Sequence, residues 1–259
     1  MKKLLHILFF TLILVLFSCS KSNINKGKSI DYPVTLISSD LNMVYSWTLN
    51  DTITPFSEKQ EQLKNYLTLE FIDKQLFDSK KNTSIEFLLA DTTVIRQKNN
   101  TLALKCEKTV VKYKNSSDEE MMSGNGKRFD YLGQIPFLNK YLIRVHYYEA
   151  LGYILIDKIS GKETQGFENY PSISTDKKHI ICIGVYPYNQ ISTNLQLFSL
   201  NGTEIKQVAT LRFARWLPKM NLENQLGRSE GFWSNDGCFY VREDGSYNKK
   251  SQYIRIKVL

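Results

Sequence analysis

The chain has 259 residues, of which 42% are hydrophobic and 23% are charged, so it is long enough and apolar enough to fold around a substantial core. Its net charge of +8 falls to +3 from Ser29 onward, because five lysines and no acidic residue precede that position. A folded part that is nearly balanced in charge argues against nucleic acid as a partner.

Residues 1–18 are predicted to be an export signal. Lys2 and Lys3 form a positive start, and the apolar run Leu4–Phe17 follows. As a helix this run would span about 21 Å, which is short of the ~30 Å hydrocarbon core of a bilayer. Cleavage is therefore favoured, and a short membrane-spanning anchor is the alternative.

Residues 16–19, Leu-Phe-Ser-Cys, resemble the cleavage site of bacterial lipoproteins, in which a small residue precedes a cysteine that receives acyl chains. The resemblance implies palmitate-type lipidation of Cys19, a tether over residues 19–30, and the lipid bilayer as a partner. In the Bacteroidota type, acidic residues after the cysteine direct surface display. Ser20–Asn23 has none, which favours a cell-envelope location in the outer membrane, facing the periplasm. Ordinary cleavage after Ser20, which releases a soluble protein, stays open.

Residues 31–127 are expected to form a β-rich N-terminal part with one short helix. The helix is predicted over Glu58–Leu67, which begins with a capping-box pair. A hairpin is predicted over Thr92–Val111, with an Asn-Asn turn at 99–100. A polar loop over Ser116–Gly126 is the candidate boundary. Further strands are predicted at Val34–Ser38, Val44–Leu49, Leu67–Ile72 and Ile85–Leu89.

Residues 128–259 contain three segments that each indicate a strand, a tight turn and a second strand, with Ser and Asp suited to hydrogen-bond the turn backbone. The segments begin at Ile135, Pro171 and Gly231. A further strand is predicted after each of them, at Gly152–Ile156, Leu195–Ser199 and Tyr253–Leu259. The first two of these strands lead into glycine turns at Gly161 and Gly202. Their spacing, 202 − 161 = 41 residues, lies within the range of about 40–45 residues for a propeller blade.

These segments resemble the β-propeller repeats of secreted bacterial proteins, including the Tol-type propellers, whose blades carry a Pro-x-x-Ser-x-Asp-Gly turn. A second similarity, to a group of exported bacterial proteins, rests on Tyr147, Tyr148, Glu149, Gly152, Tyr153, Asp157 and Gly161–Thr164. Together they cover Tyr131–Tyr240. The resemblance implies an all-β, antiparallel fold in which a propeller-like meander need not close into a ring. A β-sandwich is the alternative, and no activity is implied.

The strand predicted over Tyr141–Tyr148 carries the candidate ligand-binding site. Alternation places Arg144, His146 and Tyr148 on one face, and Glu149 follows. A guanidinium, an imidazole and a phenol on one face are suited to an anionic ligand or a glycan. For His146 itself, a hydrogen-bonded surface histidine is the favoured interpretation, and a pH-sensitive or anion-binding contact is the alternative. One solvent-exposed face is expected for this strand, as in antiparallel sheets.

The other reactive residues form no recognisable catalytic or metal-binding set. At most one disulfide can form among three cysteines in strand-like runs, and burial as small hydrophobic side chains is favoured for Cys106, Cys182 and Cys238. The histidines of the exported chain lack a zinc-binding spacing, so no metal and no cofactor is expected. Ser229 stands in a Gly-x-Ser-x-Gly run, but no histidine follows it, so a nucleophile elbow is not indicated.

The sequence therefore predicts a membrane-anchored envelope lipoprotein. Its β-rich body is expected to be a non-catalytic module that binds an envelope protein or scaffolds an assembly. A glycan- or ligand-binding lipoprotein that uses Arg144 and His146 is the alternative. A hydrolase with Glu149 and Asp157 as its carboxylates comes third, because the separation that such a pair needs cannot be read from sequence.

Overall fold

The computed structural model describes residues 44–47, 66–91, 97–98, 100–148, 150–185, 192–214, 220–221, 228–242 and 253–259. All of them belong to the second of two compact units, Pro33–Leu259. The predicted export signal, the tether, Cys19 and Glu149 lie outside the described residues. So do the strand predicted at Val34–Ser38 and most of the helix predicted at Glu58–Leu67.

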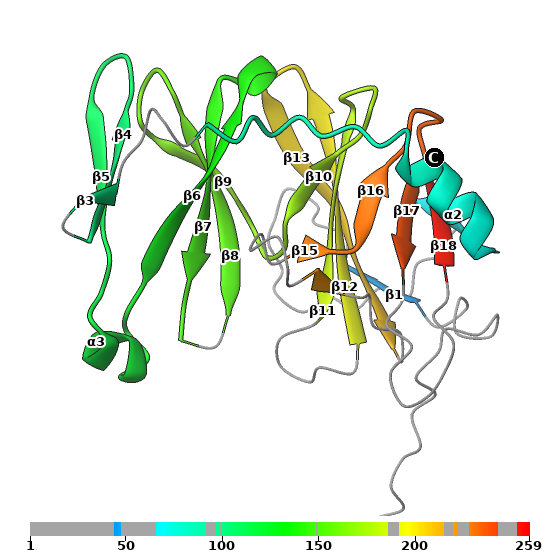
Figure 1. The fold of residues 1–259 in the computed structure, drawn as a ribbon, viewed down its shortest axis with the longest axis horizontal. Helices are drawn as coiled ribbons and strands as arrows, with labels where there is room; N and C mark the ends of the chain where they lie inside the picture. Colours follow the sequence, from blue (N-terminus) through cyan, green and yellow to red (C-terminus); the bar gives the residue numbers. More distant parts are fainter. Residues whose placement is uncertain are drawn as a thin grey trace, which may run out of the picture. The chain divides into compact units, whose positions relative to one another are not determined.

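The described part consists mainly of antiparallel strands, which confirms the predicted all-β fold (Figure 1). The β3–β5 sheet comprises β3 (Gln97–Lys98), β4 (Thr101–Lys105) and β5 (Val110–Lys114). The β6–β9 sheet comprises β6 (Arg128–Ile135), β7 (Lys140–His146), β8 (Leu151–Asp157) and β9 (Glu163–Phe167). Its strands are hydrogen-bonded in chain order, as a meander requires.

The remaining strands form two larger sheets and one small one. The β10–β13 sheet comprises β10 (Pro171–Ile173), β11 (His179–Val185), β12 (Ser192–Asn201), β13 (Glu204–Ala214) and β1 (Val44–Trp47). The β16–β18 sheet comprises β16 (Gly231–Trp233), β17 (Phe239–Arg242), β18 (Tyr253–Val258) and β2 (Leu67–Ile72). The small sheet pairs β14 (Met220–Asn221) with β15 (Arg228–Ser229). The described strands do not close into a barrel.

The three predicted tight turns are present, and the two after Ile173 and Trp233 use the expected side chains. The turn after Ile135 is a short 3-10 helix, Pro136–Leu138, without a side-chain cap. Between β10 and β11, the Ser174 hydroxyl accepts the N–H of His179 at 2.9 Å, and the Asp176 carboxylate accepts that of Lys178 at 3.0 Å. Residues with positive φ help to complete three such turns, at Asn139, Lys177 and Gly237. Local hydrogen bonds therefore define these hairpins independently of the packing between sheets.

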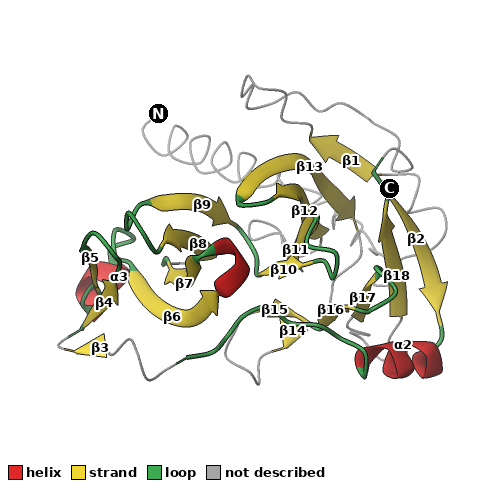
Figure 2. Cartoon of the chain, turned by 90° about the horizontal axis from the view of Figure 1, so that it is seen from above, coloured by secondary structure: helices red, strands yellow, loops and turns green. Residues whose placement is uncertain are grey.

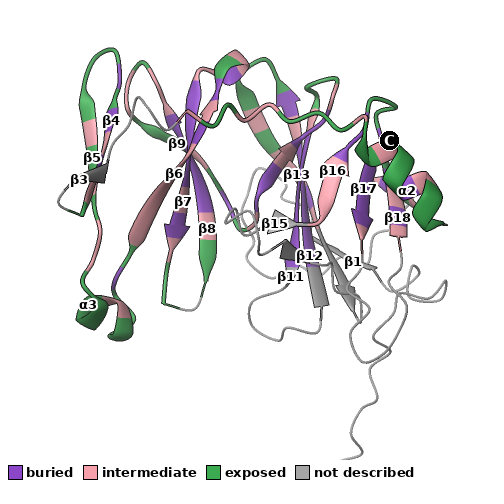
Figure 3. Cartoon of the chain, viewed as in Figure 1, coloured by how far each residue is buried: buried purple, intermediate pink, exposed green. Residues whose placement is uncertain are grey.

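The four larger sheets pack face to face in chain order (Figures 1 and 2). Leu104 and Ile143 belong to the cluster between the β3–β5 and β6–β9 sheets. Tyr153 and Phe198 belong to the next, between the β6–β9 and β10–β13 sheets. Trp233 belongs to the third, between the β10–β13 and β16–β18 sheets. The two middle sheets are therefore buried on both faces, which Figure 3 shows for β7 and β8.

This packing corrects the expectation of one solvent-exposed face for the strand at Tyr141–Tyr148. Leu142 and Ile143 point to opposite faces of β7, and both are buried. The β10–β13 sheet covers the face of β7 that was expected to be exposed to solvent. Only Arg144 and His146, near the end of β7, keep partial exposure on that face.

An N-terminal strand completes the C-terminal sheet. β2 pairs with β18 in antiparallel register, so that Leu69 lies opposite Ile256. The helix α2 (Lys74–Lys81) follows β2 and covers the outer face of the same sheet. Its Phe77 ring lies 5.1 Å from the ring of Phe232 and 4.8 Å from that of Tyr253. Residues distant in sequence thus build this sheet together.

The chain leaves α2 in an extended segment that runs toward the β3–β5 sheet (Figure 1). Ser84 forms a bridge with Ser234, and Leu89 forms one with Gln134. The strand predicted at Ile85–Leu89 is therefore wrong. The segment pairs with the edges of two different sheets, so it cannot form a continuous ladder with either.

Two helices depart from the sequence prediction. α2 was not predicted, although Asp73 caps it by accepting the N–H of Leu76 at 2.7 Å and two lysines occupy its last turn. Part of the predicted loop Ser116–Gly126 is instead the helix α3 (Asp118–Met122), which begins with a reciprocal capping box between Ser117 and Glu120. In the described stretches no helix is both long and apolar enough to cross a membrane.

Candidate functional site

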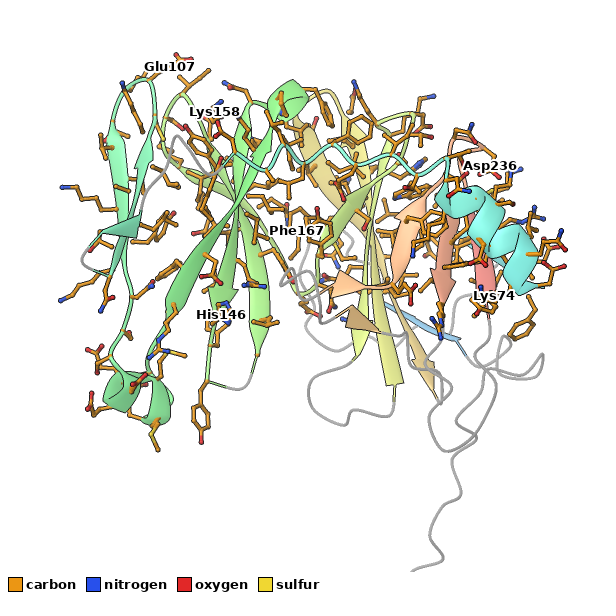
Figure 4. All side chains as sticks on the ribbon, viewed as in Figure 1. Lys74, Glu107, His146, Lys158, Phe167 and Asp236 are labelled. Carbon is orange, nitrogen blue, oxygen red and sulfur yellow. The ribbon has the colours of Figure 1, made fainter. Side chains whose placement is uncertain are left out.

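Two of the predicted ligand residues, Arg144 and His146, meet at the carboxylate of Asp130. His146 is labelled in Figure 4. Asp130 lies on β6 directly opposite Arg144 on β7. Its Oδ2 accepts hydrogen bonds from Arg144 Nε at 3.1 Å and Nη2 at 2.7 Å, and it lies 2.6 Å from His146 Nε2. We call these three residues the Asp130 cluster.

The charges of the Asp130 cluster largely compensate one another. The side chain of Arg144 is 12% exposed, that of His146 is 34% exposed and that of Asp130 is 39% exposed. Burial raises the pKa of Asp130, but hydrogen bonds from Arg144 and His146 outweigh this effect, so the pKa lies below its usual range. The ionised carboxylate neutralises the guanidinium. A polar ligand that approached the cluster would therefore meet His146 and the exposed edge of Asp130 rather than an unpaired cation.

The other two predicted ligand residues are not part of the cluster as described. β7 ends at His146, and Tyr148 lies in the following turn with 55% of its surface exposed. Among the described residues no hydrogen bond or ring contact joins Tyr148 to Asp130. Glu149 lies outside the described residues.

The turn between β7 and β8 presents aromatic and apolar side chains to solvent. Tyr147, Tyr148 and Leu151 are all exposed, and we call them the hairpin tip. The Nζ of Lys127 lies 5.4 Å from the centre of the Tyr147 ring, in a cation–π contact. Gly152 leaves room for this ring, because a Cβ there would lie 3.2 Å from it. Tyr147 is not one of the four predicted ligand residues, although it belongs to a dense group of tyrosines in the sequence that could provide a stacking surface.

Asp157, the second carboxylate of the hydrolase alternative, has a structural role. Its Oδ1 accepts the N–H and the hydroxyl of Ser160, each at 2.8 Å, and its Oδ2 lies 3.5 Å from Lys140 Nζ. The hydrogen bonds from Ser160 hold the pKa of Asp157 below its usual range. A general acid needs a raised pKa, so this carboxylate is suited to capping a turn rather than to donating a proton.

The remaining reactive residues also lie in structural positions. Ser229 is part of β15, whereas a nucleophile elbow places its serine between a strand and a helix. The three cysteines are free and buried, and burial raises the pKa of each thiol, at Cys106, Cys182 and Cys238. Within the described stretches no group of three or more His, Cys, Asp or Glu side chains could hold a metal ion.

Comparison with protein-family models, with curated proteins and with solved structures finds no match for this chain. Its function is therefore inferred from its own residues.

Proposed function

We propose that the protein is an envelope lipoprotein, anchored to a bilayer through acyl chains on Cys19, whose stack of sheets binds a protein partner without catalysis. The observation that carries the proposal is the N-terminal sequence, in which two lysines, the apolar run Leu4–Phe17 and Ser18 precede Cys19. Each buried methylene of an acyl chain adds about 0.8 kcal/mol of membrane affinity, so lipidation at this residue would hold the body beside a membrane.

A non-catalytic role is supported because the candidate catalytic side chains are buried or already interact with other residues of the chain. Asp130 neutralises Arg144, and Asp157 caps a turn. The thiols of the three cysteines are buried, with pKa values above the usual range. Catalysis requires a group that is poised to react and accessible to a substrate. These side chains hold strands and turns together instead.

The hairpin tip supports binding by surface contact. Tyrosine side chains provide a large contact area at little entropic cost and carry a hydroxyl that can hydrogen-bond a partner, which is why tyrosine is common at interfaces. Tyr148 is 55% exposed and makes no hydrogen bond or ring contact within the described part of the chain. A glycan stacked on the same ring is the second candidate, because sugars also bind to exposed aromatic faces.

The anchor is tested in cells that express the full chain and are fed a clickable palmitate analogue. The wild-type chain and a Cys106→Ala control are expected to carry the label and to sediment with membranes, because Cys106 is buried in the folded body. Cys19→Ala is expected to lose the label and to leave the membrane fraction. An unlabelled wild-type chain that begins after Ser20 would contradict the anchor.

The contact surface is tested in the same cells with a photo-cross-linking residue at position 148, and with the exposed Lys178 in another turn as the control position. A protein adduct specific to position 148 is expected. An adduct with the mass of a glycan would favour the second candidate. Equal labelling from positions 148 and 178 would exclude the hairpin tip as the binding surface.

A further inference from the structure

The β3–β5 sheet has one buried face and one open face. Leu102, Leu104, Val111 and Tyr113 point into the stack. The side chains that alternate with them on β4 and β5 point away from it: Thr101, Ala103, Lys105, Val110, Lys112 and Lys114. We call this second set the lysine face.

Among the described residues, the lysine face carries positive charge without an acidic ion-pair partner. Lys105, Lys112 and Lys114 are exposed, and within the described stretches none of them forms an ion pair or a side-chain hydrogen bond. Glu107 lies at the tip of the β4–β5 hairpin rather than on this face (Figure 4), where Lys108 follows it in the sequence. No aspartate or glutamate is present on either strand.

The face is also held in place, and Lys112 stands opposite the short side chain of Ala103 at its centre. Leu104 is fully buried behind it and fixes the orientation of both strands. Thr101 and Ala103 are short, so the long lysine side chains extend beyond them. Val110 is 53% exposed on the same face. Small ligands bind mostly in concave sites, whereas a sheet face that carries flexible cations matches an extended anionic surface.

We propose that the lysine face docks on the phosphate headgroups of an anionic bilayer. This inference rests on the proposed anchor, because acyl chains at Cys19 would keep the body within reach of the membrane. The tether carries Lys21, Lys26 and Lys28 without an acidic residue, so it has the same charge complementarity. Linking two weak membrane contacts in one chain raises the effective concentration of the second. Basic residues near an anionic membrane each strengthen binding about 5-fold.

The test uses the exported chain from residue 19 onward with Cys19→Ser, which cannot be acylated. Sedimentation is measured with vesicles of equal parts phosphatidylglycerol and phosphatidylcholine, and with phosphatidylcholine alone. We expect binding to the anionic vesicles only, with an affinity that falls as salt is added. Combined Lys105→Gln, Lys112→Gln and Lys114→Gln substitutions are expected to lower the partition coefficient about 100-fold.

The matched control removes the same charge from three exposed lysines outside the β3–β5 sheet, through Lys162→Gln, Lys178→Gln and Lys257→Gln. It is expected to lower the partition coefficient by less than about 5-fold. Circular dichroism checks that both triple variants fold. Equal losses in the two variants, or no binding by the parent chain, would overturn the proposal.

A structural role for these lysines gives a different result. If they serve only to stop the edge strand β5 from pairing with another copy, the first triple variant would self-associate while keeping its vesicle affinity. That outcome would also overturn the proposal. Because the vesicle assay uses a chain without acyl groups, absence of palmitate at Cys19 in cells would remove the anchor and leave the vesicle result unchanged.

Discussion

The β6–β9 and β3–β5 sheets are built from similar antiparallel strands but have different surroundings. β7 lies between two sheets, so Leu142 and Ile143 are both buried although they point in opposite directions. Among the described sheets only the β6–β9 sheet packs against β5, whose outward residues include Lys112. The comparison shows that position in the stack decides whether a strand face becomes core or remains available for a partner.

The largest expected effect tests this difference directly. Leu142→Ala and Ile143→Ala should each lower the free energy of unfolding by about 3 kcal/mol, because each leaves a cavity on a covered face of β7. On the β4–β5 hairpin, Leu104→Ala should lower the free energy of unfolding by a similar amount, while Lys112→Ala should change it by no more than about 0.5 kcal/mol. Urea denaturation measures all four. A large loss for Lys112→Ala would mean that the lysine face is covered.

A smaller effect tests the contact between the two sheets at a single glycine. Gly161 has φ of 73°, and a Cβ there would lie 2.5 Å from Val111 and 2.7 Å from Thr109 on the β4–β5 hairpin. Gly161→Ala should therefore cost about 2–3 kcal/mol, from backbone strain and from displacement of the hairpin.

Gly202 provides the control for this substitution. Its φ is 59°, and a Cβ there would meet nothing within 4 Å. Gly202→Ala should cost only the strain, about 1 kcal/mol. Equal losses for the two variants in thermal or urea denaturation would show that the hairpin does not pack closely against the Gly161 turn.

The smallest effect concerns the Asp130 cluster, which lies near the solvent-accessible end of β7. The pKa of Asp130 is lowered in the folded state, so its stabilisation is present above the usual pKa of about 3.9 and is lost as pH falls through the lowered value. Asp130→Asn should cost about 1 kcal/mol at neutral pH, after allowance for solvent screening, and less at a pH below the lowered pKa of Asp130.

Urea denaturation at the two pH values checks this sign. The exposed pair of Asp118 with Arg128 serves as the control, and Asp118→Asn should have no measurable effect at either pH. A loss for Asp130→Asn that grows as pH falls would contradict the ion pair with Arg144.

Much of the local structure could be predicted because it depends on neighbouring residues. The turn between β10 and β11 is stabilised by Ser174 and Asp176, which belong to the turn itself. The candidate site was predicted only in part. Alternation placed Arg144 and His146 on one face, but the partner carboxylate of Asp130 depends on the β6–β7 register, which is shifted by an irregularity near Gly133. Sequence alternation alone does not reveal such a shift.

The amino-acid sequence by itself determined the antiparallel all-β class, the hairpins with their turns, and the burial of Cys106, Cys182 and Cys238, because period-two hydrophobicity and turn chemistry act over a few residues. Only the tertiary structure decided which faces are covered, that β2 completes the C-terminal sheet, and that Asp130 neutralises Arg144. Alternation defines two faces for every strand, but what packs against each face depends on residues far away in the chain.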